Sequence, residues 1–171
     1  MRSFIPVKFI SALLVIPFLL LSCKKNNNTA PEKSPKYGKV SGIWKQQDIV
    51  LAVAAKLGGQ NIPAGTSIIA LAPALGAAGK LFTCTTGNSY QFNADGTYSI
   101  EGCTDLILPV AGNNGTWKLD VHDAVFLLTS KEGENDPHWI ENVSENTLEL
   151  SITVTIPGVA TAPLILKLER Q

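Results

Sequence analysis

The stretch that decides the fold is Tyr-Gln-Phe-Asn-Ala-Asp-Gly-Thr-Tyr-Ser-Ile-Glu-Gly-Cys, residues 90–103. Two short runs that alternate large and polar residues, 90–92 and 97–101, flank the turn sequence Asn-Ala-Asp-Gly at 93–96. Asp-Gly between such runs is a strong hairpin signal, because glycine adopts the positive φ that these turns need. The stretch therefore predicts a β-hairpin in which residue 92 pairs with residue 97.

The rest of the chain repeats this pattern of strand, turn and strand. Alternation is cleanest at 147–156, where Leu and Ile or Val residues alternate with Glu, Ser and Thr. A long first strand near 41–55 needs a bulge at 45–48, because Trp44 and Ile49 have opposite parity. The remaining predicted strands are 115–121, 124–129, 138–143 and 164–168. Eight strands joined by short turns predict an all-β, antiparallel up-and-down barrel, because closure removes exposed sheet edges.

The connections of this barrel divide into two groups by length. Short turns at 93–96, 122–123 and 144–146 share one end, and longer connections at 56–89, 104–114, 131–137 and 157–163 share the other. We expect the end with long loops to be the mouth of a small cavity. The residues predicted to line the cavity are Phe126, Leu150, Ile152, Val154 and Leu166.

Residues 56–83 form an unusually long and apolar connection near the mouth. They are rich in Ala, Gly and Leu, and Lys56 and Lys80 are their only charges. A short helix can begin after Ser67 as N-cap, with Pro73 as a kink. Such a segment could cover the mouth, lie on a membrane, contact a partner or pack on the domain itself, and the sequence does not choose among these roles.

The N-terminus is typical of an export signal. Arg2 and Lys8 precede a short apolar run that ends in Leu-Leu-Ser before Cys23. This end resembles a bacterial lipobox, and the resemblance implies cleavage after Ser22 and acylation of Cys23 with lipid chains such as palmitate. Lys24, rather than Asp, argues by resemblance for the outer membrane, facing the periplasm. A plain signal peptide and an uncleaved anchor are the alternatives.

Three regions follow from this pattern: a lipoprotein signal peptide at 1–22, the lipidated cysteine with a disordered basic linker at 23–39, and a barrel domain at 40–171. The linker carries five Lys against one Glu, whereas the domain carries seven Lys or Arg against thirteen Asp or Glu. A basic linker can touch anionic lipid, and an acidic domain argues against nucleic-acid binding. We expect a monomer with no cofactor.

The chain has three cysteines, and two are left once Cys23 is acylated. An even remainder in an exported protein predicts a disulfide between Cys84 and Cys103. The alternative, a metal or redox pair, lacks close spacing and His partners.

These segments together resemble a family, the lipocalin-like lipoproteins of Bacteroidota. Gly42-Ile43-Trp44 matches the G-x-W signature of lipocalins. The hairpin with its two cysteines, the Gly-Thr-Trp at 115–117 and the Leu-Glu-Leu at 148–150 match later segments of the family. The resemblance covers roughly residues 41–170. It implies a barrel that binds a lipid or another small apolar ligand, and it brings no catalytic residues.

In lipocalins the tryptophan of G-x-W closes the bottom of the barrel under an arginine of the last strand. Antiparallel pairing of the first and last strands brings Arg170 near Trp44 independently of the resemblance. We therefore expect a cation–π contact between them, worth about 0.5–2 kcal/mol.

Catalytic and metal chemistry finds little support in the sequence. No nucleophile elbow, zinc-binding His pair or phosphate loop occurs, so we expect a protein that is not an enzyme. His122 with Asp123 fits a solvated turn, and Glu132, Glu134 and Asp136 lack the pattern of a calcium loop. Trp117 and Trp139 are interpreted as core or rim aromatics. Two functions remain, a ligand-binding barrel and a filled barrel with a structural or interaction role in the envelope.

Overall fold

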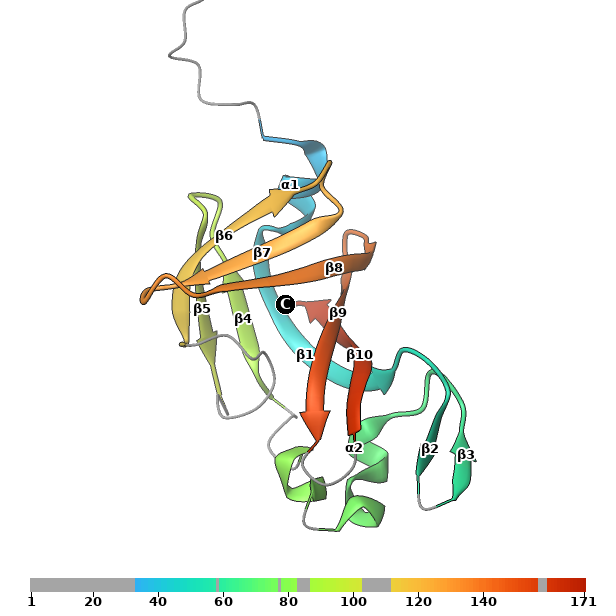
Figure 1. Cartoon of the computed structure of the whole chain (residues 1–171). Helices are drawn as coiled ribbons and strands as arrows, with labels where there is room; N and C mark the ends of the chain where they lie inside the picture. Colours follow the sequence, from blue (N-terminus) through green and yellow to red (C-terminus); the bar gives the residue numbers. More distant parts are fainter. Residues whose placement is uncertain (1–32, 58, 77, 83–86, 103–111, 157–159) are drawn as a thin grey trace, which may run out of the picture. The chain divides into compact units, whose positions relative to one another are not determined.

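The barrel predicted from the sequence is confirmed. The computed structural model describes residues 33–57, 59–76, 78–82, 87–102, 112–156 and 160–171. Eight strands form a closed antiparallel barrel in which neighbours in sequence are neighbours in space, and β1 pairs with both β4 and β10 (Figure 1). The barrel strands are β1 Gly42–Leu51, β4 Ser89–Phe92, β5 Thr97–Glu101, β6 Asn114–Asp120, β7 Val125–Ser130, β8 Asn135–Val143, β9 Thr147–Ile156 and β10 Ala160–Arg170.

The bulge predicted in the first strand is present. The register of β1 against β10 shifts between Gln46 and Asp48. This shift corrects the parity mismatch, because it lets Trp44 and Ile49 both point into the barrel, where each is at most 1% exposed.

The hairpin of β4 and β5 forms, but its predicted register is wrong by one residue. Phe92 pairs with Tyr98, not with Thr97. The Asp95 carboxylate accepts hydrogen bonds from the Thr97 N–H at 2.8 Å and from its hydroxyl at 2.7 Å. These bonds hold Thr97 against the turn, so the turn is longer than its four-residue signal suggested. Cys84 and Cys103, predicted to form a disulfide, lie outside the described residues.

Two strands are longer than predicted. Each continues through a proline, and the prediction had started the strand after that proline. β8 begins at Asn135 and includes Pro137, and β10 begins at Ala160 and includes Pro163. Pro137 pairs only with β7, since pairing of β8 with β9 starts at Trp139. Pro163 likewise lies beyond the last β1–β10 pair. A proline is tolerated where one side of a strand is unpaired. Because β8 begins at Asn135, the predicted loop at 131–137 is shortened to a turn at 131–134.

The long apolar connection is folded. A two-stranded hairpin of β2 Ala55–Leu57 and β3 Gln60–Ile62 is followed by α2 Ile68–Leu71 and two 3-10 helices, η1 Ala72–Leu75 and η2 Ala78–Phe82. The Ser67 hydroxyl accepts a hydrogen bond from the Ala70 N–H at 3.2 Å, so the predicted N-cap is confirmed. The hairpin was not predicted, because three-residue strands are too short to show a period.

A helix, α1 Pro35–Val40, occupies part of the predicted linker. Residues 33–39 belong to the same compact unit as the barrel, so the expectation of disorder over these residues is wrong. Ser34 caps the helix, and Pro35 stands at its first turn. Val40 is fully buried, and the Tyr37 ring stacks on Trp117 at 4.1 Å. Only Tyr37 and Val40 anchor this helix, and they lie among lysines and prolines. Two apolar positions are too few to show a helical period in the sequence.

Candidate functional site

One end of the barrel is closed by the pair expected from the sequence. Trp44 and Arg170 occupy paired positions of β1 and β10, and the guanidinium lies 4.3 Å from the centre of the indole ring. Trp44 is fully buried, and its indole N–H donates to the Val40 carbonyl at 2.8 Å. The expected contact is therefore present, and it joins α1, the first strand and the last strand in one plug.

Gly42 is required at this plug for two reasons. Its φ of 143° lies in a region that other residues rarely adopt. A Cβ atom on Gly42 would lie 2.2 Å from Arg170 Nη1. The glycine of the G-x-W motif thus leaves room for the guanidinium to cover the tryptophan.

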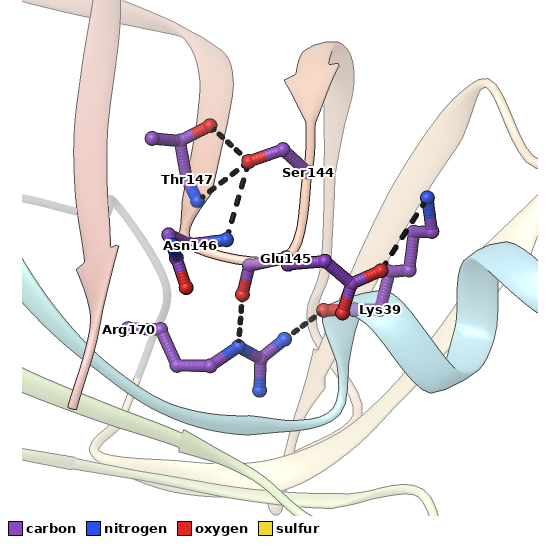
Figure 2. Close-up of polar contacts among 6 residues, drawn as sticks. All are labelled: Lys39, Ser144, Glu145, Asn146, Thr147 and Arg170. Carbon is purple, nitrogen blue, oxygen red and sulfur yellow. Dashed lines mark hydrogen bonds and ion pairs between the residues drawn. The ribbon is translucent and has the colours of Figure 1, made fainter.

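Arg170 also joins separate segments of the closed end through backbone carbonyls. Its Nε donates to Glu145 at 2.5 Å, and its Nη1 donates to Ser41 at 2.9 Å. Its Nη2 donates to Lys39, and the Lys39 ammonium lies 3.7 Å from the Glu145 carboxylate (Figure 2). This fork of donors fixes the β8–β9 turn against α1.

Three lysines around α1 reach the three short turns of the closed end. Lys33 Nζ donates to the Ala94 carbonyl in the β4–β5 turn, and Lys36 Nζ donates to the Asp123 carbonyl in the β6–β7 turn at 2.8 Å. Lys39 pairs with Glu145 in the β8–β9 turn. The closed end is thus held by Arg170 and three lysines, each of which has a partner.

The residues predicted to line a cavity face the barrel interior. Phe126, Leu150, Ile152 and Leu166 are at most 2% exposed, and Val154 is half-buried beside them. The aliphatic members, with Leu148, Leu164 and Leu168, make one side of the interior, formed by β9 and β10 and continued by Ile49 and Leu51 of β1, whereas Phe126 lies on β7. We call this set the aliphatic wall.

The facing strands carry polar side chains that sequence analysis missed. On β8, Asp136 and His138 share the inner face, and their side chains are 19% and 2% exposed. His138 Nε2 lies 2.9 Å from Asp136 Oδ2, so the two side chains are each other's partner inside the barrel. The spacing Asp-x-His was readable, but Pro137 concealed the strand that places both residues inside.

Two neighbouring strands extend this polar surface across the barrel wall. The Tyr98 ring of β5 lies against Gly115 of β6, where a Cβ atom would be 2.9 Å from the ring and 2.1 Å from the Thr129 carbonyl. Burial raises the pKa of Tyr98, and the negative charges of Asp136 and Glu132 raise it further. Ser130 of β7 is buried, and its hydroxyl accepts from the Glu134 N–H at 3.1 Å. We call Tyr98, Ser130, Asp136 and His138 the polar stripe.

A second buried polar group joins β1 to β4. The Gln46 carbonyl oxygen Oε1 accepts from the Tyr90 hydroxyl at 2.9 Å and from Asn88 Nδ2 at 3.4 Å. Gln46 Nε2 is buried without a hydrogen-bond partner in the described structure. Burial strongly raises the pKa of Tyr90, and a hydrogen bond with Asn88 partly opposes this effect.

The other residues weighed in the sequence are dispersed. His122 is exposed in the β6–β7 turn, and Glu132 and Glu134 are exposed in the β7–β8 turn. Trp117 is a core residue as expected, whereas Trp139 is 58% exposed on the outer face of β8, so its assignment to core or rim is wrong. No group of three potential metal ligands occurs among the described residues, and Cys23 lies outside them.

Two surface hollows lie outside the aliphatic wall and the polar stripe. One, of about 350 Å³, is formed by the helical segment and is lined by residues that include Ile69, Pro73 and Phe82. The other, of about 290 Å³, lies at the closed end between Ile43 and the β4–β5 turn. Over the described part of the chain, no helix combines the length and hydrophobicity needed to cross a membrane.

Comparison with known proteins identifies no family for this chain. No protein-family model matches the chain, and no curated protein matches it. The fold therefore defines the class: an eight-stranded, up-and-down, closed antiparallel barrel, consistent with the lipocalin and calycin type of binding protein.

Proposed function

We propose that this chain is a membrane-anchored, lipocalin-like lipoprotein that binds a small apolar ligand or lipid in the cell envelope without catalysing a reaction. The observation that carries the proposal is a barrel plugged at one end by Trp44 and Arg170, with an aliphatic wall facing inward. Barrels of eight strands are wide enough to hold one small ligand. Gln46 Nε2 on β1, a buried donor without a hydrogen-bond partner in the described structure, also favours an occupant that can hydrogen-bond.

The anchor in this proposal is Cys23, acylated after cleavage of residues 1–22, in the outer membrane facing the periplasm. Its support is the lipobox-like sequence and Lys24. Changing Cys23→Ala should remove the acyl mass and release the protein into the soluble fraction. Retention of the variant in the membrane would contradict this part of the proposal.

The ligand is tested on the full-length chain purified from its own membrane. Native mass spectrometry should show a bound small molecule, and solvent extraction should release an apolar compound. Ile152→Trp places a large side chain in the interior and should abolish this mass, although overpacking costs about 1–3 kcal/mol of stability. Ile43→Trp is the matched control, because Ile43 is 45% exposed on β1 and its replacement should leave the bound mass unchanged.

A filled barrel with a structural or interaction role is the second candidate. Its support is that the cavity-facing residues are themselves in one packed hydrophobic cluster. An experimental structure separates the two functions, because a ligand-binding barrel needs an interior void of roughly 300–1,000 Å³ that opens at the mouth. A dry, filled interior together with no copurified mass would favour the second candidate.

A further inference from the structure

We propose that Gln46 recognises the ligand of this barrel by donating a hydrogen bond to an uncharged carbonyl group, so that the site selects an apolar ketone or ester over an alcohol or a carboxylate. This inference rests on the proposed ligand-binding function and names the chemical class of the ligand. Its observation is the side-chain nitrogen Nε2 of Gln46, which is buried and has no hydrogen-bond partner in the described structure.

Gln46 lies inside the barrel, beside the surface that an apolar ligand would contact. It follows Trp44 by two positions on β1, and both side chains are buried, so they share the inner face of the strand. Gln46 pairs with Leu168 of β10, whose buried side chain belongs to the aliphatic wall. The unpartnered donor therefore belongs to a side chain next to this wall, one inward-facing position beyond the plug at the closed end.

Two neighbouring side chains fix the orientation of this amide. The Tyr90 hydroxyl donates to Gln46 Oε1 at 2.9 Å, and Asn88 Nδ2 donates to the same oxygen at 3.4 Å. Burial raises the pKa of Tyr90, so its hydroxyl keeps the proton that it donates. Because both lone pairs of Oε1 are occupied, Nε2 is the end of the Gln46 amide that remains for a ligand.

This donor separates carbonyl compounds from alcohols. An amide N–H needs an acceptor, and a ketone or ester carbonyl supplies one without bringing a donor of its own. An alcohol can also accept, but its O–H then needs an acceptor in turn, and Gln46 Oε1 already receives two hydrogen bonds. The alcohol would therefore bury an O–H without a partner, which lowers its affinity.

Charge separates carbonyl compounds from carboxylates. The buried residues in the described part of the chain include no Lys or Arg that could neutralise an anion. Arg170, two positions beyond Leu168, already donates to three backbone carbonyls, and His138 pairs with Asp136. A carboxylate would accept the hydrogen bond from Gln46 but would stay a buried charge without a counter-charge, which is costly in a protein interior.

The test titrates three probes with the same eight-carbon chain, 2-octanone, 2-octanol and octanoate, into the full-length chain in phosphatidylcholine nanodiscs at pH 7. Isothermal titration calorimetry measures the affinities, and empty nanodiscs correct for partition of each probe into lipid. Nitrogen-15 labelling of glutamine side chains shows whether a probe reaches Gln46, whose amide signal is assigned by substituting this residue.

The expected result is saturable binding of 2-octanone that shifts the Gln46 amide signal. Affinity should fall from the ketone to the alcohol to the carboxylate, by about fivefold or more at the first step. Gln46→Met keeps the length of the side chain but removes the donor, so it should bind the ketone and the alcohol equally. Gln47→Met is the matched control, because Gln47 is exposed at the next position and its replacement should preserve the preference.

Tyr90→Phe provides a second variant that does not remove the Gln46 donor. It vacates one lone pair of Gln46 Oε1, so the 2-octanol hydroxyl gains an acceptor. The difference in affinity between the ketone and the alcohol should therefore narrow in this variant. Near-ultraviolet circular dichroism checks that each variant is folded.

Three outcomes would overturn the inference: equal affinity of the unmodified protein for ketone and alcohol, tightest binding of octanoate, or saturable binding that leaves the Gln46 amide signal unchanged. The last outcome would mean that water, rather than the ligand, satisfies the donor. In each of these cases a probe still binds, so the proposed function survives. If no ligand copurifies and no probe saturates, the inference and the proposed function both fail.

Discussion

The closed end of the barrel and the polar stripe use charged side chains in opposite ways. At the closed end, Arg170 and the lysines around α1 each contact a carbonyl or a carboxylate. In the polar stripe, Asp136 and His138 lie together in the interior and pair with each other at 2.9 Å. Polar groups that face solvent lose little hydration when they pair, whereas a buried pair must offset the cost of removing both side chains from water. We therefore expect the closed end to contribute more to stability than the polar stripe.

The strongest way to break this comparison is to remove the plug. Trp44→Ala should lower the free energy of unfolding by about 3–5 kcal/mol, because a fully buried indole and its bond to Val40 are lost. Urea denaturation followed by circular dichroism measures the change. Trp139→Ala is the matched control, since Trp139 is exposed, and it should change stability by less than about 0.5 kcal/mol. Equal effects of the two changes would contradict the role of the plug.

A smaller loss is expected from Arg170→Ala, about 2–3 kcal/mol, because three donors to backbone carbonyls and the cation–π contact disappear together. Arg170→Lys should recover less than half of this loss, because an ammonium lacks the planar fork. Lys39→Ala removes an exposed pair and should cost about 0–0.5 kcal/mol. Full recovery by lysine would show that charge alone holds this end.

Inside the barrel, removing the charged pair is not expected to lower the free energy of unfolding. Replacing both members of the pair, Asp136→Leu with His138→Leu, should leave stability unchanged or raise it by about 1–2 kcal/mol, because apolar residues need no hydrogen-bond partners. The same denaturation assay measures the change, and Arg170→Leu at the closed end should be destabilising in parallel. A loss above about 2 kcal/mol in the double variant would place the pair among the stabilising contacts of the fold.

The smallest effect at neutral pH is expected from Tyr90→Phe, about 1 kcal/mol for the lost hydrogen bond to Gln46. Burial holds the Tyr90 pKa above its usual value of about 10, so its protonated form is favoured in the folded state. The stability that this provides is present below pH 10 and is lost as pH rises toward the folded pKa, by about 1.4 kcal/mol per pH unit. The stability difference between the two proteins should therefore shrink or reverse between about pH 9 and about pH 11. A constant difference across this range would contradict the burial effect.

The sequence pattern was sufficient to predict features whose local signal agrees with the tertiary fold. The alternation of β9, the bulge of β1 and the N-cap at Ser67 are each local features, and each is confirmed. The Trp44–Arg170 contact follows from topology alone, because closure of an antiparallel meander brings the two ends of the chain together. These features need only hydrophobic period and turn chemistry.

The candidate site was less predictable, because it depends on where strands begin. Asp136 was assigned to a loop, since Pro137 normally ends a strand, and only the absence of a β9 partner at that position allows the strand to continue. Tyr98 was read as a hairpin residue, and its place over Gly115 is set by the pairing of β5 with β6, which no local pattern predicts. The partners of α1 lie in turns more than 60 positions away, which no local pattern reveals.

The sequence by itself therefore determined the number and order of the barrel strands and the inward-facing residues of β9 and β10, because each depends on period-two alternation along one segment. Only the tertiary structure decided which polar side chains enter the barrel and which have partners there. Burial and hydrogen bonding depend on the residues that other strands bring opposite, and the register of those strands is set by closure of the whole barrel.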